Sequence, residues 1–225
     1  MTSPSPLLFD TYYHVFNRGV NRENIFLQER NYSHFLKLYI HYIDPITETF
    51  AFCLLRNHFH LLLRVKSEAE IQETLRVSSF DQKGNRRVAF VENEPGQPGK
   101  PLGSGYVSKK FSNFFNAYAK SINQAYGRTG SLFQHPFGRV LVTTDSQFWN
   151  VIAYIHQNPQ KHQFVTDFRE WKWTSYQVIL SEKPTKLARQ ATLDWFGGKE
   201  NYLEMHQQWV TDANSQWFAE EDFDE

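Results

Sequence analysis

The residues that most constrain the fold are 54–65, which read Leu-Leu-Arg-Asn-His-Phe-His-Leu-Leu-Leu-Arg-Val. On a β-strand alternate residues share a face, so His58 and His60 project together while Phe59 points to the opposite side. Neutral imidazole is a common metal ligand, and two imidazoles side by side supply half of a divalent-metal site. A bare His-X-His pair also fits an ordinary half-exposed strand. The rest of the chain must decide between the two interpretations.

Length and cysteine content bound the class of protein. A chain of 225 residues can bury one sizeable core and carry a small appendage, so we expect a domain over residues 1–180 and a helical C-terminal extension with an acidic tail over 181–225. The single cysteine, Cys53, excludes an internal disulfide and suits a reducing cytoplasm. Neither a membrane span nor a signal peptide is visible, and the sequence predicts a soluble cytoplasmic protein.

Charge is segregated along the chain although the formal net charge is zero. Residues 95–144 contain no Asp or Glu but carry six Lys or Arg, whereas five of the last six residues are acidic. This separation is typical of a surface that contacts phosphates, and the aromatic content of 16% leaves rings that can stack on bases. The alternative is that a loop and a helix lack acids by chance.

Hydrophobic periodicity and capping residues predict a strand, helix, hairpin, helix, strand order, with one more helix following. The predicted strands are 12–18, 49–55, 58–65 and 137–144, and the predicted helices are 31–43, 68–77, 108–126 and 145–157. Asn31 or Ser33 is expected to cap the first helix, and Ser67 with Glu70 the second. Residues 80–105 read as turn and loop with a possible short strand at 87–92, and 171–176 and 192–210 as short helical pieces. We therefore predict an α+β sandwich, an antiparallel sheet covered on one face by helices.

The predicted helix 108–126 carries one apolar stripe. Phe111, Phe115, Tyr118 and Ile122 recur at helical spacing, so this stripe should face the sheet and Tyr118 should bring a hydroxyl to the buried side. The alternative is a core tyrosine whose hydroxyl has found a hydrogen-bond partner.

Five blocks of sequence, taken in order, resemble a known family. They are residues 13–19 (YHVFNRG), 56–63 (RNHFHLLL), 116–123 (NAYAKSIN), 126–134 (YGRTGSLFQ) and 154–159 (YIHQNP), the last followed by His162. In this order and spacing they are similar to the IS200-like tyrosine transposases, in the branch of the REP-associated tyrosine transposases. The resemblance covers roughly residues 12–176.

The resemblance implies a ferredoxin-like fold of the HUH (His-hydrophobic-His) endonuclease class, with the histidine pair on a central strand. It implies that His58 and His60 bind Mg²⁺ or Mn²⁺ and that Tyr118 is the nucleophile. The implied enzyme nicks and rejoins single-stranded DNA at hairpins or palindromic repeats through a 5′-phosphotyrosine link. Because a phenol with a pKa near 10 is a poor nucleophile at neutral pH, it needs in-line placement against a polarised phosphate, roughly 5–10 Å from the pair in an empty site.

The chain departs from the family pattern in two places. Arg56 stands where the turn before the histidine pair commonly has proline, and it adds a candidate phosphate contact. In insertion-sequence relatives a third metal ligand lies one turn beyond the tyrosine; here that residue is Ile122, so Asn123 becomes the nearest oxygen donor. The candidate DNA-binding residues are Arg18, Arg56, Lys109, Lys110, Lys120, Arg128 and Arg139.

Several alternatives remain open at this stage. Tyr106, Tyr126 and Tyr154 are rival nucleophiles, with Tyr154 expected to pack on its own helix. His14 is a candidate neighbour of the metal site, while His156 and His162 are expected to shape a helix end. A non-catalytic hairpin-binding protein is the main alternative function, and a metallohydrolase lacks a visible carboxylate partner. The protein is expected to act as a monomer or homodimer.

Overall fold

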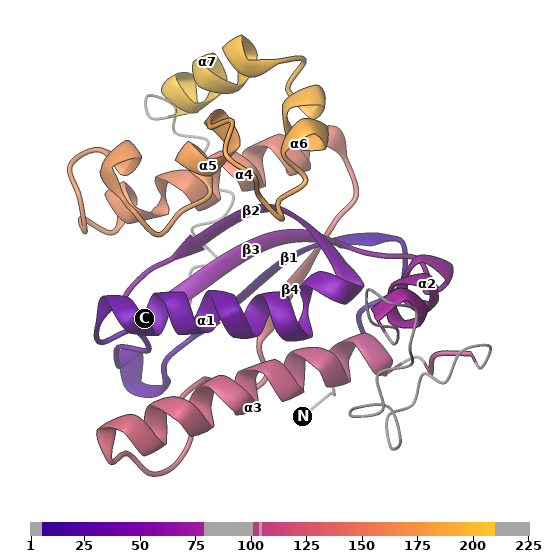
Figure 1. Ribbon diagram of the computed structural model, residues 1–225. Coiled ribbons are helices and arrows are strands. Elements are labelled where there is room, and N and C mark those ends of the chain that lie inside the picture. The colour runs from indigo at the N-terminus through magenta and orange to yellow at the C-terminus, as the bar shows by residue number, and fades with distance from the viewer. Residues whose placement is uncertain (1–5, 79–100, 104, 210–225) are drawn as a thin grey trace.

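The computed structural model describes residues 6–78, 101–103 and 105–209, which form a four-stranded antiparallel sheet packed between helices (Figure 1). The strands are β1 (Thr11–Arg18), β2 (Thr47–Leu54), β3 (His58–Val65) and β4 (Gly138–Val142), in the spatial order β2-β3-β1-β4. The helices are α1 (Glu29–Tyr42), α2 (Glu68–Ser78), α3 (Tyr106–Tyr126), α4 (Asp145–Lys161), α5 (Tyr176–Leu180), α6 (Arg189–Trp195) and α7 (Lys199–Trp209). Short 3-10 turns lie at Val20–Arg22, Asp44–Ile46 and Phe168–Glu170. Within this part of the chain no helix has the length and apolar character needed to cross a bilayer.

Strand β3 is central and is buried along nearly its whole length, Arg64 being its one half-buried member. Its residues divide between two faces as strand geometry requires: Phe59, Leu61 and Leu63 belong to one core, and Leu62 belongs to another. The register pairs Phe16 of β1 with His60 of β3, so these two side chains lie on the same face of the sheet.

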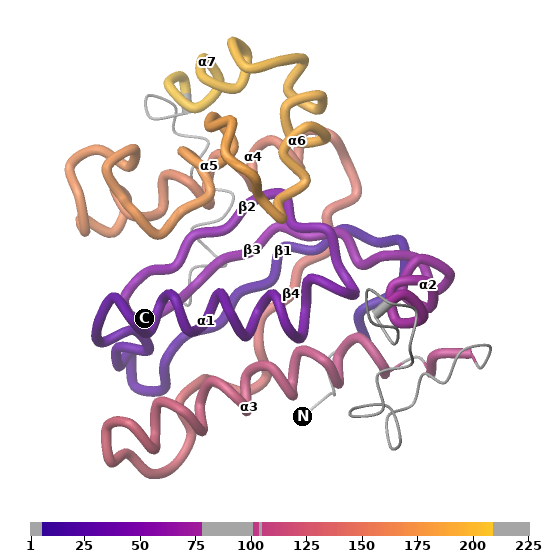
Figure 2. The backbone as a smooth tube through the Cα atoms, viewed as in Figure 1, coloured from indigo at the N-terminus to yellow at the C-terminus, as the bar shows by residue number. Residues whose placement is uncertain are grey.

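Helices cover both faces of the sheet. Figures 1 and 2 show α1 and α3 on one side and α4 to α7 on the other. The first core is built on the α1 and α3 side by Phe35, Phe59, Phe111, Phe114 and Tyr118, and the second on the α4 side by Phe50, Leu62, Phe148, Ile152 and Tyr202. The predicted α+β class with an antiparallel sheet is therefore confirmed, but the expectation that helices cover one face alone is wrong. Both faces of β3 are apolar enough to require a helical layer.

Element ends follow local capping with a few corrections. The Ser67 hydroxyl accepts from the backbone N–H of Glu70, whose carboxylate accepts from the Ser67 N–H, so the predicted capping box of α2 is confirmed. Helix α3 ends before Gly127, whose φ of 62° suits a left-handed C-cap. Helix α1 begins before the predicted caps, with Gln28 at the N-cap and Asn31 inside the first turn.

Two other boundaries differ from the sequence prediction. Helix α4 does not stop at residue 157 but continues through Pro159 to Lys161. Pro159 lacks an N–H, but the His162 N–H donates to the Asn158 carbonyl and completes the last turn. Residues 171–176 are mostly not helical: the Leu54 N–H donates to the Trp173 carbonyl and Thr174 pairs with Cys53, which covers the outer edge of β2. The possible strand at 87–92 lies outside the described residues.

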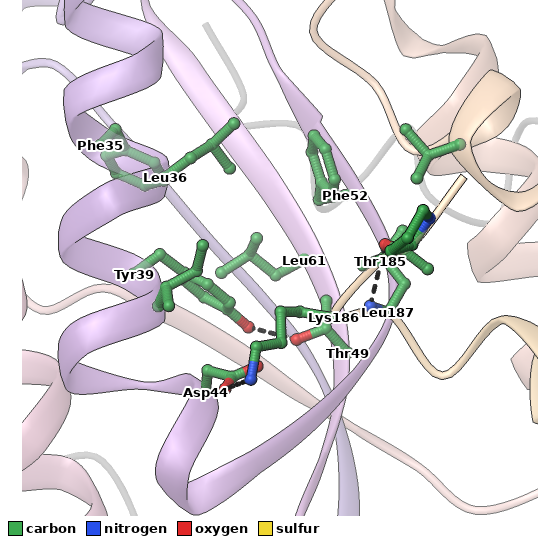
Figure 3. A pocket seen from close by; sticks show the side chains of 13 residues that line it. Phe35, Leu36, Tyr39, Asp44, Thr49, Phe52, Leu61, Thr185, Lys186 and Leu187 are labelled. Carbon is green, nitrogen blue, oxygen red and sulfur yellow. Dashed lines mark hydrogen bonds and ion pairs between the residues drawn. The ribbon is translucent and has the colours of Figure 1, made fainter. Parts of the chain in front are cut away.

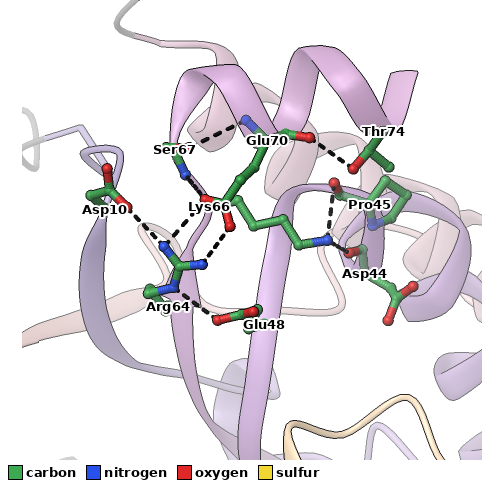
Figure 4. A network of polar contacts seen from close by, with 9 residues as sticks. All are labelled: Asp10, Asp44, Pro45, Glu48, Arg64, Lys66, Ser67, Glu70 and Thr74. Carbon is green, nitrogen blue, oxygen red and sulfur yellow. Dashed lines mark hydrogen bonds and ion pairs between the residues drawn. The ribbon is translucent and has the colours of Figure 1, made fainter. Parts of the chain in front are cut away.

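Arg64, near the end of β3, joins this strand to β2, to α2 and to the turn before β1 through its guanidinium (Figure 4). It contacts Asp10, Glu48 and Glu70, each at 2.8 Å. The hydrogen bonds from Arg64 and Ser67 lower the pKa of the Glu70 carboxyl to about 2. This network attaches α2 to one end of the sheet. His58 lies at the opposite end of β3.

Candidate active site on the α4 face of the sheet

His58 and His60 lie on the face of β3 that α4 covers. His58 Nε2 is 3.0 Å from Asn158 Oδ1, and its Nδ1 is 2.8 Å from Asn57 Oδ1. His60 Nδ1 is 3.0 Å from Nε2 of His14 on β1. Each imidazole therefore has a neighbour that fixes its ring, one from the preceding turn and one from the adjacent strand.

Helix α4 brings a tyrosine and an amide to these histidines. Tyr154 and Asn158 are four residues apart and thus share one side of the helix. The Tyr154 ring lies edge-on to His60, with centroids 5.3 Å apart, and 5.8 Å from the ring of His14. A phenol, a carboxamide and two imidazoles consequently meet between α4 and β3.

The surroundings of His60 favour its neutral form and a negative ligand. Burial lowers the pKa of His60 well below its ordinary value, and His14, His58, His162 and Lys161 lower it further. These neighbours are either imidazoles or a cation. Lys161 Nζ lies 5.1 Å from the centroid of the Tyr154 ring. These neighbours favour a neutral imidazole, which is the form that can ligate a metal. Their positive potential would also attract a phosphate.

The donor set fits a hard divalent cation. His60 Nε2 is buried and has no hydrogen-bond partner among the described residues, while its other nitrogen is engaged by His14. The 3.0 Å between His58 Nε2 and Asn158 Oδ1 matches the spacing of adjacent ligands around an octahedral ion with bonds of about 2.1 Å. No group of three or more His, Cys, Asp or Glu able to hold a metal occurs in the described part of the chain. Asn158 Oδ1, 3.0 Å from His58 Nε2, is an oxygen donor that could join the two histidines in a set of three.

Tyr118 does not lie with the histidine pair. Its ring is fully buried in the core between α1, α3 and the sheet, where its hydroxyl donates to the Ile25 carbonyl at 2.8 Å. Burial raises the pKa of this hydroxyl above its ordinary value. The prediction that Tyr118 stands near His58 and His60 is wrong, because its stripe packs on the Phe59 side of the sheet.

Asn123 is also remote from the pair. It lies near the C-terminal end of α3, on the other face of the sheet, and its Nδ2 donates to the Gly130 carbonyl at 2.8 Å. Its amide shapes the turn after α3, so the structure does not bring the predicted third ligand to the histidine pair. Ile122 is buried in the core beside Tyr118.

The predicted DNA-binding residues divide between two regions. Arg18 pairs with His58 in the strand register, and Arg56 lies two residues before it. Arg139 stacks on Phe137 and reaches Ser108 on the α3 side. The remaining candidates, Lys109, Lys110, Lys120 and Arg128, belong to α3 or the turn after it, and Arg128 forms an ion pair with Glu23.

Sequence reasoning missed residues that the structure groups at the site. Asn158 and Lys161 were not singled out, and Tyr154 was given a packing role. A usable signal was present in the spacing of Tyr154, Asn158 and Lys161, which recur at four and three residues along one helix side. His14 does neighbour His60, and the ring of His162 lies 4.9 Å from that of His58.

The other rival tyrosines do not meet the histidines. Tyr126 donates its hydroxyl to Asn31 Oδ1 on the α1 side, at 3.0 Å. Tyr106 is buried at the start of α3, beneath the Lys110 ammonium. Of the tyrosines considered as nucleophiles, Tyr154 is the one whose ring contacts His60.

An apolar cavity of about 470 Å³ lies apart from this site, between α1, β2 and residues 184–187 (Figure 3). Phe35, Phe52 and Leu61 contribute to its walls. Its polar groups are already engaged: the Tyr39 hydroxyl is 2.7 Å from Thr49 Oγ1, and Lys186 is 3.6 Å from Asp44. The cavity offers little for phosphate chemistry, which leaves the α4 face as the candidate site.

Comparison with known proteins agrees with the sequence blocks. No family model matches the chain. A curated relative described as a putative REP-associated tyrosine transposase, from Haemophilus influenzae strain Rd, is 24% identical over 129 residues, which is 57% of this chain and 58% of the relative's length. A solved REP-associated tyrosine transposase bound to a REP hairpin has a similar fold, with a TM-score of 0.52, 13% identity, and coverage of 84% of this chain and 91% of the other. In sequence and in fold, the chain thus resembles the REP-associated tyrosine transposases.

Proposed function

We propose that this chain is a metal-dependent enzyme that nicks and rejoins single-stranded DNA beside hairpins, and that Tyr154 is its nucleophile. One observation carries the proposal: the phenol of Tyr154 and the amide of Asn158, on one side of α4, meet His58 and His60 of β3. The reassignment from Tyr118 to Tyr154 follows from this geometry.

The reaction is a phosphoryl transfer to tyrosine. The Tyr154 oxygen attacks the scissile phosphorus, an O–P bond forms, and the bond from phosphorus to the 3′ oxygen breaks. The departing 3′ oxygen gains a proton overall, in place of the one that the phenol loses. The 5′-phosphotyrosine link conserves the phosphodiester energy, so attack by a 3′-hydroxyl rejoins DNA and frees the tyrosine.

His58, His60 and Asn158 would hold the metal, an Mg²⁺ or Mn²⁺ ion. When bound, the ion supplies Lewis-acid polarisation of the scissile phosphate. Asn57 and His14 hold the rings of His58 and His60 in orientation through their hydrogen bonds. Lys161, whose Nζ lies 5.1 Å from the centroid of the Tyr154 ring, places a positive charge beside this side chain that can contact the substrate phosphate.

The proposed substrate is DNA that pairs into a hairpin and continues as a single strand. The solved structural neighbour is bound to a REP hairpin, which supports this partner for the present chain. Arg18, Arg56 and Lys161 surround the histidine end of the site and provide cations for phosphate contacts. Phe164, beneath the Arg56 guanidinium, offers a ring close to the same end.

The proposal is tested with labelled hairpin oligonucleotides taken from the DNA that flanks the gene. In Mg²⁺ or Mn²⁺ the wild-type protein should form a covalent adduct that survives denaturing electrophoresis, and EDTA should abolish it. His58→Ala and His60→Ala should lose the adduct but bind the hairpin within about threefold of wild type, because most affinity comes from phosphate neutralisation elsewhere.

The main alternative is a hairpin-binding protein without turnover. It predicts tight hairpin binding by the wild-type protein and no adduct with any metal or flanking sequence. A double variant of His58 and His60 that keeps full activity in Mg²⁺ would instead exclude the metal site.

A further inference from the structure

A buried chain of hydrogen bonds connects α7 to α4, and α4 to β2 through Ser175. His206 Nδ1 is 2.7 Å from the Tyr202 carbonyl oxygen, and His206 Nε2 is 2.8 Å from His156 Nδ1. His156 Nε2 is 2.7 Å from Ser175 Oγ, which accepts from the Phe52 N–H of β2 at 2.8 Å. The side chains of His156, Ser175 and His206 are fully buried.

The Tyr202 carbonyl oxygen sets the donor and acceptor roles of the two rings when both rings are neutral. A carbonyl oxygen can only accept, so His206 Nδ1–H donates to Tyr202 and His206 Nε2 is left to accept from His156 Nδ1–H. His156 Nε2 then accepts from the Ser175 hydroxyl at 2.7 Å, a shorter contact than the one between this hydroxyl and the Phe52 carbonyl oxygen at 3.3 Å. Burial lowers the pKa of His206 to about 4, which agrees with a neutral ring.

His156 lies between the two site residues of α4. It is two residues after Tyr154 and two before Asn158, and a rotation of about 200° separates it from each, so it points away from them. Gln157 adds a second link on this side, since its Nε2 donates to the His206 carbonyl at 2.7 Å. His206 of α7 therefore contacts the side of α4 that faces away from His58 and His60, between the positions of Tyr154 and Asn158.

The residues around His206 indicate that its hydrogen bonds matter, in addition to its burial. His206 packs among Tyr176, Phe196 and Tyr202, where an apolar ring would fill the same space without requiring partners. Hydrogen bonds require particular donor and acceptor positions. They therefore restrict the rotational position of a helix about its axis more than apolar contacts do.

We propose that His206 is a positioning residue: through His156 it sets the rotation of α4 and so places Tyr154 and Asn158 against His58 and His60. The inference rests on the proposed function. It assigns a part in the reaction to His206 of α7, which reaches α4 through the His156 side chain and, by its carbonyl, through Gln157. Misplacement of a reacting group by about 1 Å can cost roughly 100-fold in rate, so a small rotation of α4 suffices.

The test compares three variants of the full chain. His206→Phe keeps a ring in the aromatic cluster and removes the acceptor; His206→Gln presents an oxygen near the position of Nε2, and His206→Asn a shorter amide that reaches Tyr202 but not His156. We expect His206→Phe and His206→Asn to slow adduct formation roughly 10- to 100-fold, with hairpin Kd within about threefold of wild type, and His206→Gln to recover most of the rate. Mn²⁺ titration should show weaker metal binding for the two slow variants.

A matched control is His34→Phe. His34 Nε2 is 2.9 Å from the Ser121 hydroxyl, so this histidine also links two helices, but on the α1 and α3 side. Its adduct rate should stay at the wild-type level. A wild-type rate in His206→Phe overturns the inference. Should His206→Phe fail to fold, equal rates and equal Mn²⁺ affinities in the Gln and Asn variants overturn it instead.

The proposed function fails in a different way. A wild-type protein without adduct, or a Tyr154→Phe variant that retains it, overturns the proposed function and this inference with it. An active wild-type protein with an inert Tyr154→Phe and a fully active His206→Phe overturns the positioning role alone.

Discussion

Helices α3 and α4 lie on opposite faces of the same sheet, and each buries a tyrosine against it. Tyr118 of α3 meets Phe35 and Phe133 and donates to a backbone carbonyl, as a core tyrosine does. Tyr154 of α4 meets His14 and His60. The two helices differ in which residues of β3 they face, odd-numbered apolar ones or the histidines. The face of β3 that each helix covers therefore decides which side chains its tyrosine contacts.

The largest expected effect comes from exchanging each hydroxyl for hydrogen. Tyr154→Phe should abolish the covalent adduct, a loss of at least about a thousandfold, because no other oxygen replaces the nucleophile. Tyr118→Phe should stay within about threefold of wild type. Denaturing gels with labelled hairpin DNA measure both. An adduct that persists in Tyr154→Phe and disappears in Tyr118→Phe would contradict this comparison of the two faces.

The asparagines of the two helices give the second comparison. Asn158→Ala removes an amide oxygen that lies 3.0 Å from His58 and should weaken Mn²⁺ binding roughly 10- to 100-fold. Asn123→Ala removes a contact with Gly130 and should leave Mn²⁺ affinity unchanged. Calorimetric titration in the absence of DNA separates the two, and equal Mn²⁺ affinities would mean that Asn158 is not a ligand.

The salt dependence of binding tests which face holds the DNA. Arg56→Ala and Lys161→Ala should each reduce the slope of log affinity against log salt by about 0.7, the amount expected for one phosphate contact on a single strand. Lys109→Ala and Lys120→Ala, on α3, should change this slope less. The opposite ranking would move the DNA to the α3 side, where the sequence-based prediction had most of its contacts.

The smallest effect concerns stability on the α3 face. Tyr118→Phe leaves the Ile25 carbonyl without its hydroxyl donor and should lower the free energy of unfolding by about 1 kcal/mol. Urea denaturation followed by fluorescence measures this change. A larger loss would show that the hydroxyl holds more than one local contact.

Much of the fold could be predicted from local sequence. Alternation around His58, the Ser67 and Glu70 capping box and the Gly127 end of α3 each depend on short-range rules, and each agrees with the structure. The resemblance to REP-associated tyrosine transposases was likewise readable from five blocks. Pro159 misled the prediction of where α4 ends, because proline was taken as a stop although it lies two residues before the end.

The candidate site was harder to predict because it depends on long-range placement. Helical spacing shows that Tyr118 faces the sheet but not which face of the sheet it meets. Phe59 and the two histidines point to opposite sides, so an apolar stripe such as that of α3 fits the Phe59 side. The approach of Asn158 to His58 spans 100 residues of sequence, and no local pattern encodes it.

The connection of residues 19–26 links Tyr118 on one face of the sheet to the turn that precedes His58. The N–H groups of Ile25 and Phe26 donate to the Arg56 carbonyl, and that of Gly19 donates to the Asn57 carbonyl, while Tyr118 holds Ile25 from the far side. A Cβ at Gly19 would lie 2.1 Å from the Glu23 carbonyl oxygen, so this segment has no slack. These amides should therefore exchange with solvent as one cooperative unit with the turn that precedes His58. Opening of that unit would detach the connection from the turn before His58, and one exchange rate shared by the Gly19, Ile25 and Phe26 amides would reveal it.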